Sequence, residues 1–468
     1  MNPLSQADPV FALHRAPDGD AAAHKRDVKV VLLEGIHPSA VEALRRDGYT
    51  RIVTHAKALA GAELSAAIAD AHLLGIRSRT KITADVLEHA HRLAAIGCFC
   101  IGTNQVALSA AARLGIPVFN APFSNTRSVA ELVLAEIIML MRGIPQKNAT
   151  LHRGGWVKSA ARSHEVRGKT LGIVGYGHIG TQIGMLAEHL GMSVLFHDIE
   201  AKLPLGNARE AASLDELLRV ADVVSLHVPE TPATSNMIGR GQLATMKPGS
   251  YLINASRGSV VEIEALVAAL DSRHLHGAAI DVFPTEPQGN DSAFTSPLVR
   301  FDNVLLTPHI GGSTSEAQIN IGREVAAKLI RYTNNGSTTS AVNFPEVALP
   351  EHMGRTRLLH IHRNVPGVLA HLNEQFSAAG VNISAQYLST NEEVGYVVVD
   401  VDGAVDRLTL ANLHAIPATI RCRALPMLDA ESAPDSDVSS AAAALPRGHR
   451  APAAAAALES AVSCGPAQ

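Results

Sequence analysis

Arg257, Glu286 and His309 are the residues of this chain whose types and order best suit a reaction. Each follows an apolar run, in LINASRG, AIDVFPTEP and VLLTPHIGG. An arginine offers a permanent bidentate fork for carboxylate and carbonyl oxygens. A histidine titrates near neutrality, and a neighbouring glutamate raises its pKa and fixes its orientation. Taken one at a time, the three residues could be an exposed Arg, a helix-capping Glu and a packed His. Together they suit proton transfer at a carbonyl oxygen beside a carboxylate.

A glycine motif supplies a candidate cofactor site. Gly175, Gly177 and Gly180 follow the apolar run TLGIV and open the helical segment HIGTQIGMLAEHLG. In a strand–turn–helix they permit a tight turn, close approach of a pyrophosphate and close helix packing, with the helix N-terminus facing the phosphates. Asp198, 18 residues after Gly180, would bind a ribose diol and repel a 2′-phosphate. NAD is favoured over NADP, a choice that Lys202 leaves open, and the alternative is a glycine turn without a ligand.

The elements that must position these residues alternate between short β-branched runs and helical stretches. The run 129–143 is apolar almost all round, which predicts a helix buried between layers, and 39–48 is predicted as an amphipathic helix. Strands that are apolar on both faces and alternate with helices indicate an α/β fold with parallel, doubly wound sheets. These strands are predicted at 28–35, 51–55, 72–77, 91–97, 170–175, 193–198, 221–227, 249–255, 276–282 and 303–308.

The pattern changes after Asn343. A Pro-containing stretch that includes the linker 351–356 leads into a β-α-β-β order, followed by a further helix and strand, which is a ferredoxin-like βαββαβ module. Its segments are 357–362, 365–380, 383–389, 394–401 and 419–425. Residues 1–23 are predicted to be disordered. So is 429–468, an Ala/Ser/Pro-rich tail without Ile, Phe, Tyr or Trp.

Composition excludes several classes of protein. The 468 residues are 47% apolar with a net charge of −4, so the chain can bury a core but offers no basic field for nucleic acid or a membrane surface. No apolar run approaches the roughly 18 residues of a membrane span, and residues 1–26 lack the apolar region of a secretory signal. Four cysteines make no disulfide framework and no zinc spacing, which predicts free thiols in a reducing cytoplasm and no metal.

The motifs resemble those of the D-isomer-specific 2-hydroxyacid dehydrogenases, most closely the bacterial members that act on D-3-phosphoglycerate and carry a C-terminal ACT domain. The resemblance runs from about Val28 to Leu425, through GIRSRT, AIGCFCIGTNQV, APFSNTRSVAEL, LGIVGYGHIGTQ, INASRG, GAAIDVFPTEP, LLTPHIGGST and AVNFPEV. It implies a discontinuous flavodoxin-like substrate-binding domain at 24–124 and 313–350. A Rossmann-type NAD-binding domain at 125–312 and an ACT domain at 357–428 would complete the chain.

The resemblance also implies roles for individual residues. Arg257 would bind the substrate's carboxylate and carbonyl, His309 would be the acid/base and Glu286 its partner. Asp281 would hold the nicotinamide amide. The implied NAD contacts are Gly175, Gly177, His178, Ile179, Gly180, Asp198, Ala255, Ser256, Arg257, Asp281, His309, Ile310, Gly311 and Gly312.

Arg77 and Arg79 flank Ser78 at the end of a predicted strand. On a strand the two arginines would alternate faces and be merely solvated, whereas a loop past the strand end would let them converge. In the resembled family this motif faces the substrate's 3-phosphate, which suits bidentate guanidinium chemistry, with Asn125 nearby. Trp156, the only tryptophan, inserts into a neighbouring subunit in that family, so the resemblance implies a homo-oligomer, a tetramer.

The C-terminal module resembles ACT domains that bind amino acids at paired interfaces. His362, Asn364 and Asn382 match the residues that hold L-serine there, although asparagines are also common in turns. The family's Gly-Gly hinge reads Met353-Gly354 here, and the segment for the final helix is slightly short. These departures concern the sensitivity of feedback inhibition rather than catalysis.

Three functions are compatible with the sequence. The first is NAD-dependent oxidation of D-3-phosphoglycerate to 3-phosphohydroxypyruvate, the first step of serine synthesis. The second is reduction of 2-oxoglutarate to 2-hydroxyglutarate, with the same arginines holding the distal carboxylate. The third is a non-enzymatic NAD-sensing scaffold, like the transcriptional corepressors that share this fold. The Arg77/Arg79 pair and the ACT module favour the first.

Overall fold

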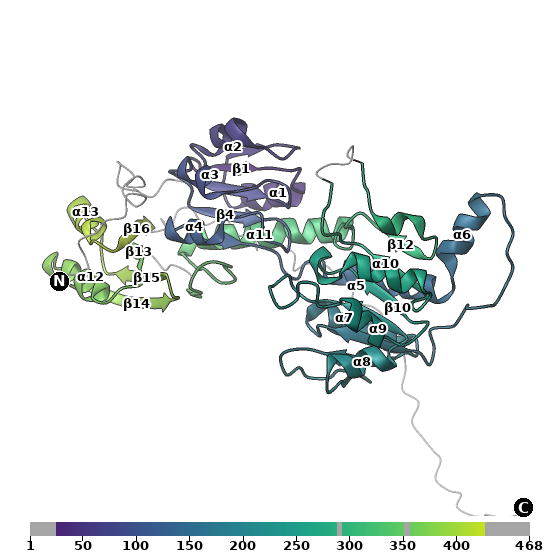
Figure 1. The fold of residues 1–468 in the computed structure, drawn as a ribbon. Helices are drawn as coiled ribbons and strands as arrows, with labels where there is room; N and C mark the ends of the chain where they lie inside the picture. Colours follow the sequence, from purple (N-terminus) through teal and green to yellow (C-terminus); the bar gives the residue numbers. More distant parts are fainter. Residues whose placement is uncertain (1–24, 288–292, 351–355, 426–468) are drawn as a thin grey trace, which may run out of the picture. The chain divides into compact units, whose positions relative to one another are not determined.

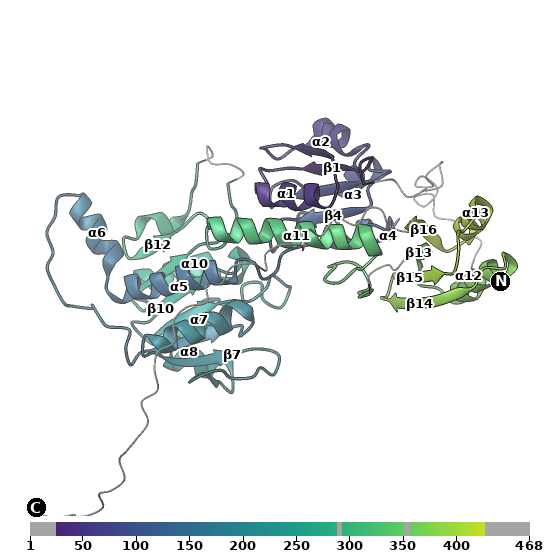
Figure 2. The same ribbon diagram turned by 180° about the vertical axis from the view of Figure 1, so that it is seen from behind.

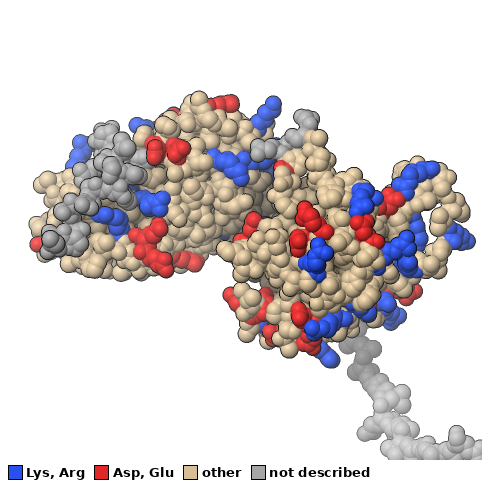
Figure 3. Space-filling view, viewed as in Figure 1, with Lys and Arg blue, Asp and Glu red and all other residues tan. Residues whose placement is uncertain are grey.

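The computed structural model describes residues 25–287, 293–350 and 356–425, which form three β-sheets with their covering helices (Figure 1). The predicted disordered ends, Cys464 and Met353-Gly354 lie outside these residues. Within the described part of the chain, no helix has both the length and the apolar character needed to cross a membrane. On the face in Figure 3, basic and acidic side chains are interspersed rather than gathered into a field of one sign.

The first sheet has five parallel strands in the order β2-β1-β3-β4-β5. This is the flavodoxin-like order of a doubly wound sheet. Helix α11 (Ser315–Asn335) comes from much later in the sequence, yet it packs against α1 and β4 (Figure 2). The other elements are β1 (Lys29–Leu32), α1 (Pro38–Arg46), β2 (Arg51–Thr54), α2 (Gly61–Ile68), β3 (Leu73–Ile76), α3 (Ala84–Glu88), β4 (Ala95–Cys98), α4 (Leu108–Arg113) and β5 (Val118–Phe119).

Strand β4 differs from its prediction. It was expected over 91–97 but begins only at Ala95. The chain turns first, since the Leu93 N–H donates to the Ala90 carbonyl at 3.1 Å. The apolar run therefore includes a turn as well as a strand. Strand β5 was not predicted, because two residues are too short to show an alternating pattern.

The second sheet has seven parallel strands in the order β12-β11-β10-β9-β6-β7-β8. Strand order reverses between β6 and β9, which is where open α/β sheets bind ligands. This seven-stranded sheet with its helices confirms the predicted Rossmann-type fold. Its elements are α5 (Thr126–Met141), α6 (Ile144–His152), β6 (Thr170–Val174), α7 (His178–His189), β7 (Ser193–His197), β8 (Arg209–Glu210), α8 (Leu214–Val220), β9 (Val223–Leu226), α9 (Arg240–Thr245), β10 (Tyr251–Asn254), α10 (Ile263–Asp271), β11 (Gly277–Ile280) and β12 (Val304–Leu306).

Helix α5 is less enclosed than its apolar sequence predicted. Val133, Ile137 and Leu140 are buried on one side, where the helix packs against α7, β10 and β11. Glu131 on the opposite side is exposed. The helix ends at Met141, just before Gly143, which adopts a left-handed φ of +60° that favours glycine.

The third sheet is antiparallel in the order β14-β15-β13-β16. The predicted βαββαβ module is confirmed. Its hydrophobic core includes Leu358, Leu372, Phe376 and Val399, which lie between the sheet and its two helices. The elements are β13 (Thr356–Arg363), α12 (Val368–Ala378), β14 (Ile383–Thr390), β15 (Val394–Val401), α13 (Arg407–Ala415) and β16 (Thr419–Leu425).

Candidate active site

The glycine loop between β6 and α7 has the geometry that a dinucleotide needs. Gly175 has φ +91°, and a Cβ there would lie 2.5 Å from the His227 carbonyl oxygen. A Cβ on Gly180 would lie 2.2 Å from the Gly175 carbonyl oxygen, so only glycine lets the helix approach the strand. At Gly177 nothing lies within 4 Å of the Cβ position, which leaves open space for a pyrophosphate. Helix α7 begins at His178 without a side-chain cap, so its first N–H groups can face phosphates.

Asp198 follows β7 and is turned toward the glycine loop. Its carboxylate accepts hydrogen bonds from the Tyr176 N–H at 2.8 Å and the Glu200 N–H at 3.0 Å. Lys202 pairs with Glu200 at 2.5 Å rather than with Asp198. The residues present therefore fit NAD: glycines for the pyrophosphate and an anchored carboxylate for the adenosine ribose.

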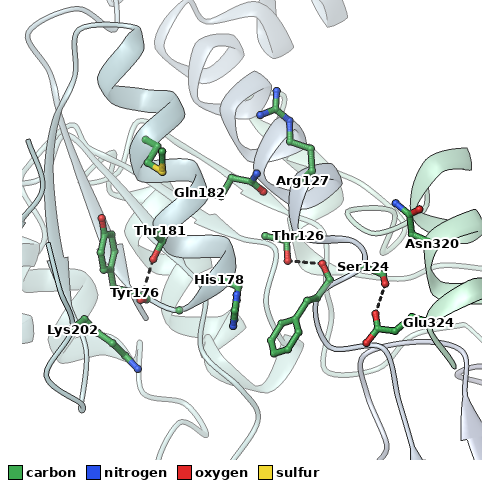
Figure 4. A pocket seen from close by; sticks show the side chains of 13 residues that line it. Ser124, Thr126, Arg127, Tyr176, His178, Thr181, Gln182, Lys202, Asn320 and Glu324 are labelled. Atoms are coloured by element: carbon green, nitrogen blue, oxygen red, sulfur yellow. Dashed lines mark hydrogen bonds between the residues drawn. The ribbon is translucent and has the colours of Figure 1, made fainter. Parts of the chain in front are cut away.

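A cavity of about 900 Å³ opens beside this loop, against the starts of α5 and α7 and against α11 (Figure 4). The Phe123 and His178 rings contact each other there, with centroids 3.9 Å apart. Ser124 donates to Glu324, and the Thr181 hydroxyl donates to the Tyr176 carbonyl at 3.3 Å. Of this lining, the sequence had pointed only to Gly177, His178 and Lys202. Its residues are Phe123, Ser124, Thr126, Arg127, Tyr176, Gly177, His178, Thr181, Gln182, Met185, Lys202, Asn320 and Glu324.

His309 and Glu286 come together as the sequence predicted. The Nδ1 atom of His309 lies 2.9 Å from Glu286 Oε2, and the His309 side chain is half-exposed. The bond to Glu286 raises the pKa of His309 above 6.5, against an opposing effect of burial. Burial alone would raise the pKa of Glu286. The hydrogen bonds from His309 and from the Phe283 N–H lower it by more than burial raises it, so the pKa of Glu286 lies below its usual value. An imidazolium is thus stabilised on a loop where His309 adopts φ +55°.

Asp281 holds the loop that carries His309. Its buried carboxylate accepts hydrogen bonds from the Thr307 hydroxyl at 2.6 Å, the Ile310 N–H at 2.8 Å and the Gly311 N–H at 2.8 Å. These contacts give Asp281 a structural task that the sequence did not show. Its contact with the nicotinamide amide stays a prediction.

Glu136 is a buried carboxyl on α5 that the sequence did not single out. Both of its side-chain oxygens are buried without a hydrogen-bond partner in the described chain. Burial, and secondarily the charge of Asp281, raises the pKa of Glu136 to about 8. At neutral pH Glu136 is therefore mostly protonated, so it adds little charge beside Asp281.

Arg257 follows β10, and its chain segment is held against the segment that leads to Glu286. The Asn254 side-chain amide donates to the Arg257 carbonyl at 2.9 Å. A Cβ on Gly258 would lie 2.1 Å from the backbone carbon of Phe283, so the two segments touch. Ala255 and Ser256 lie on the same connection, with the Ser256 hydroxyl bonded to the Asn254 side chain at 2.8 Å.

Arg77, Ser78 and Arg79 form a loop after β3, with Ser78 and Arg79 exposed. Of the two readings left open, the loop is therefore the correct one. A Cβ on Gly102 would lie 3.9 Å from an Arg257 guanidinium nitrogen, and the Gln105 side-chain amide donates to the carbonyls of both Gly102 and Arg77, so the two arginines flank one segment. Asn125 is buried against Gly312, whose Cβ position lies 2.2 Å from the Asn125 amide nitrogen.

The three predicted effector residues do not meet within one chain. His362 lies at the end of β13 opposite Gly395, with its Nε2 buried and without a partner in the described residues. Asn364 is close by and donates to the Asn391 carbonyl at 2.7 Å. Asn382 precedes Ile383, which pairs with Val401 at the far end of β15, so it lies at the opposite end of the sheet.

No group of three or more His, Cys, Asp and Glu residues in the described ranges is placed to hold a metal ion. Cys98, which is buried, and Cys100, which is partly buried, are free thiols.

The fold and site define an NAD-dependent oxidoreductase of the α/β type. Residues 134–311 match the family model of the D-isomer specific 2-hydroxyacid dehydrogenase NAD-binding domain, and 358–421 match an AHAS small subunit-like ACT domain. The chain belongs to the D-isomer-specific 2-hydroxyacid dehydrogenase family, in its D-3-phosphoglycerate dehydrogenase branch.

Curated relatives and solved structures support that membership. D-3-phosphoglycerate dehydrogenase of Escherichia coli K12 is 63% identical over 403 residues, which span 86% of this chain and 98% of the relative. The enzyme of the same name from Haemophilus influenzae is 60% identical over 401 residues, again 86% and 98%. The structure of Aquifex aeolicus D-lactate dehydrogenase, complexed with NAD and lactic acid, aligns with a TM-score of 0.61 at 27% identity, covering 68% of this chain and all of that one.

Proposed function

We propose that the chain oxidises D-3-phosphoglycerate to 3-phosphohydroxypyruvate with NAD, the first step of L-serine synthesis. The observation that carries the proposal is the His309–Glu286 pair, which follows the ends of β12 and β11 as Arg257 follows the end of β10, together with the Arg77–Arg79 loop, where Ser78 and Arg79 are exposed. The relatives named D-3-phosphoglycerate dehydrogenase support this choice of substrate.

The geometry supports a role for each of the protein groups in this reaction. Bound NAD supplies the hydride acceptor. Because Nδ1 of His309 faces Glu286, Nε2 is the atom that takes the proton from the substrate hydroxyl, and the glutamate stabilises the resulting imidazolium. Arg257 binds the carboxylate and the developing carbonyl oxygen through its two-pronged guanidinium. Ser78, Asn125 and the arginines at 77 and 79 hold the phosphate end.

One assay separates the three compatible functions. NADH consumption is measured with 3-phosphohydroxypyruvate, with 2-oxoglutarate and with neither. We expect the highest kcat/KM with 3-phosphohydroxypyruvate and a weaker side activity with 2-oxoglutarate, whose distal carboxylate carries less charge than a phosphate. NADH binding without turnover of either compound would instead identify a corepressor-type scaffold.

Arg79→Ala tests the assignment of the phosphate. A hydrogen bond to a charged group is worth roughly 1.5–3 kcal/mol, so the KM for 3-phosphohydroxypyruvate should rise about tenfold or more. Hydroxypyruvate, which lacks the phosphate, should be affected much less. Arg219→Ala, on an exposed arginine of α8 paired with Asp215 and outside the cavity lining, is the control. An equal loss for both keto acids would mean that Arg79 is structural.

We also propose that L-serine inhibits the enzyme by binding between paired ACT domains. His362 and Asn364 lie at one end of the sheet and Asn382 at the other. A single serine can therefore meet all three residues only if one copy of the module supplies His362 and Asn364 and a second copy supplies Asn382. Asparagine and histidine offer the donors and acceptors that a hydroxylated zwitterion needs.

A serine titration of initial rates tests this regulation. Coupling of this kind typically changes affinity about 5–150-fold. We expect serine inhibition at the weak end of this range, because the linker lacks the Gly-Gly hinge of the family. Asn364→Ala should weaken inhibition, whereas Asn373→Ala, on exposed α12, should leave it unchanged. Serine that binds by calorimetry without changing rates would show lost coupling; no binding at all would exclude these effector residues.

The proposed assembly is a homo-tetramer. Trp156 is 80% exposed on the segment that follows α6. An exposed tryptophan of this size is typical of a contact surface. In the assembly, a neighbouring subunit would cover the Trp156 side chain that is exposed in the single chain. Tryptophan fluorescence measured as the protein is diluted checks this contact, because dissociation would uncover the ring.

A further inference from the structure

Glu34 is a buried carboxylate that lies directly under the Arg77–Thr80 loop. It follows β1, adopts φ +64° and is 2% exposed. Its Oε1 accepts hydrogen bonds from the Arg77 N–H at 3.1 Å and the Thr80 N–H at 2.9 Å. Its Oε2 accepts one from the Arg79 N–H at 3.0 Å. A single side chain thus fixes the backbone on both sides of Ser78.

The charge on Glu34 is maintained despite its burial. A buried carboxylate is costly unless hydrogen bonds satisfy it. Burial alone would raise the pKa of Glu34. The hydrogen bonds from the N–H groups of Thr80, Arg79 and Arg77 lower it by more than burial raises it, so the pKa of Glu34 lies below its usual value. The Arg79 Nε atom lies 3.7 Å from Oε2, which adds a favourable charge contact. Glu34 is therefore ionised and acts as a permanent acceptor.

Gln105 holds the same loop from its carbonyl side. The Gln105 side-chain amide donates to the Arg77 carbonyl at 2.7 Å and to the Gly102 carbonyl at 3.1 Å. Glu34 and Gln105 are both buried. The backbone at Arg77 is thus held by hydrogen bonds on both its N–H and its carbonyl, and these bonds restrict how its side chain can be aimed.

This arrangement determines how the loop can recognise an anion. Many phosphate sites use backbone N–H groups that point at the ligand. Here the N–H groups of Arg77, Arg79 and Thr80 point at Glu34 instead. Among the four N–H groups from Arg77 to Thr80, only that of Ser78 does not donate to Glu34, so recognition of the phosphate depends mainly on the directions in which the guanidiniums leave the backbone.

We propose that Glu34 is a positioning residue that aims Arg77 and Arg79, and thereby sets the preference for a phosphorylated over an unphosphorylated 2-keto acid. The proposal rests on the proposed function, because it takes those arginines as the phosphate-binding groups. Glu34 does not touch the reacting atoms. Its effect should appear in substrate selectivity rather than in the chemical step.

Glu34→Gln is the sharpest test, because it keeps the size of the side chain and replaces one accepting oxygen with an NH₂ group. Whichever way the amide turns, at least one loop N–H then faces a donor. We expect the KM for 3-phosphohydroxypyruvate to rise about tenfold, while the KM for hydroxypyruvate and both kcat values stay within about twofold. Glu34→Asp keeps the charge but withdraws it by one methylene, so it should change the KM ratio in the same direction and by less.

A matched control is Asp222→Asn in the second sheet. Asp222 also accepts a backbone hydrogen bond, from the Thr170 N–H at 2.9 Å, but at the start of β9 rather than at the strand ends that carry the site. This substitution should leave the KM ratio unchanged. A thermal-unfolding midpoint for each variant separates lost stability from lost selectivity.

Two outcomes would overturn the proposal, and they differ from failure of the proposed function. If Glu34→Gln raises both KM values equally, or only lowers the unfolding midpoint, Glu34 is merely structural. If Glu34→Gln does not fold, Glu34→Asp decides: an unchanged ratio of the two KM values in that variant would also show that Glu34 is merely structural. If Arg79→Ala, measured in parallel, does not alter the KM for 3-phosphohydroxypyruvate, then the arginines do not bind the phosphate, and the proposed function fails at that point together with this inference.

Discussion

His309→Ala is expected to lower kcat by about 10²–10⁴-fold, the usual contribution of a general acid or base. The loss arises because no other proton acceptor replaces the imidazole that Glu286 orients at 2.9 Å. NADH binding, measured by fluorescence titration, should change little, since the glycine loop and Asp198 lie on other strand ends. His189→Ala, on an exposed histidine at the end of α7, is the control. Full activity in His309→Ala would exclude it as the acid/base.

The pH dependence of the reaction provides a second check on the same pair. In oxidation His309 must start neutral, so the rate should rise with pH through a value above 6.5, because Glu286 raises the pKa of His309. In Glu286→Gln the negative partner is lost, and that pKa falls. The rise in the oxidation rate should therefore move to lower pH, and the fall in the reduction rate should move with it. A profile that does not move would show that Glu286 does not tune His309.

The parts of the site that sequence predicted are those whose signal is local. The loop from Gly175 to Gly180 combines a tight turn with close helix packing, and few other residue types permit either. His309 and Glu286 each end an apolar run, and parallel strands bring their ends to one edge of the sheet. The parallel, doubly wound α/β fold followed from the alternation of strands and helices. Where an element was too short, as in β5, the pattern carried no signal.

The parts that sequence could not predict depend on contacts between distant residues. Glu34 meets Arg77 and Thr80 across 43 and 46 residues, and nothing near Glu34 in the sequence marks it as a partner. Asp281 was expected at the cofactor, but its role in holding the His309 loop appears only once the chain is folded. The distance between Asn364 and Asn382 likewise depends on how β14 pairs with β15. Motif matching located Asp281, Asn364 and Asn382 without showing their geometry, and it did not locate Glu34.

The contacts of the most buried charged side chain in the C-terminal module could not be predicted from the sequence either. Arg357 on β13 is 1% exposed. Its Nε and Nη2 atoms donate to the two carboxylate oxygens of Asp400 on β15, at 2.6 and 2.8 Å. Its Nη1 donates to the carbonyls of Asn335 and Pro350, both at 3.1 Å. A buried ion pair of this kind is weak evidence for stability, but breaking it leaves an uncompensated charge.

Arg357→Met is therefore expected to lower the free energy of unfolding of the ACT module by about 3–5 kcal/mol, because Asp400 would remain buried without its partner. Hydrogen exchange measured by mass spectrometry on peptides from β13 and β15 reports this loss locally. The double variant Arg357→Met/Asp400→Leu removes both charges, and replacing a whole buried pair with apolar side chains is often neutral or stabilising. Its exchange should return close to that of the parent chain. If the double variant exchanges as fast as the single one, the cost comes from lost packing, or from the two carbonyls that Arg357 caps, rather than from the charge of Asp400.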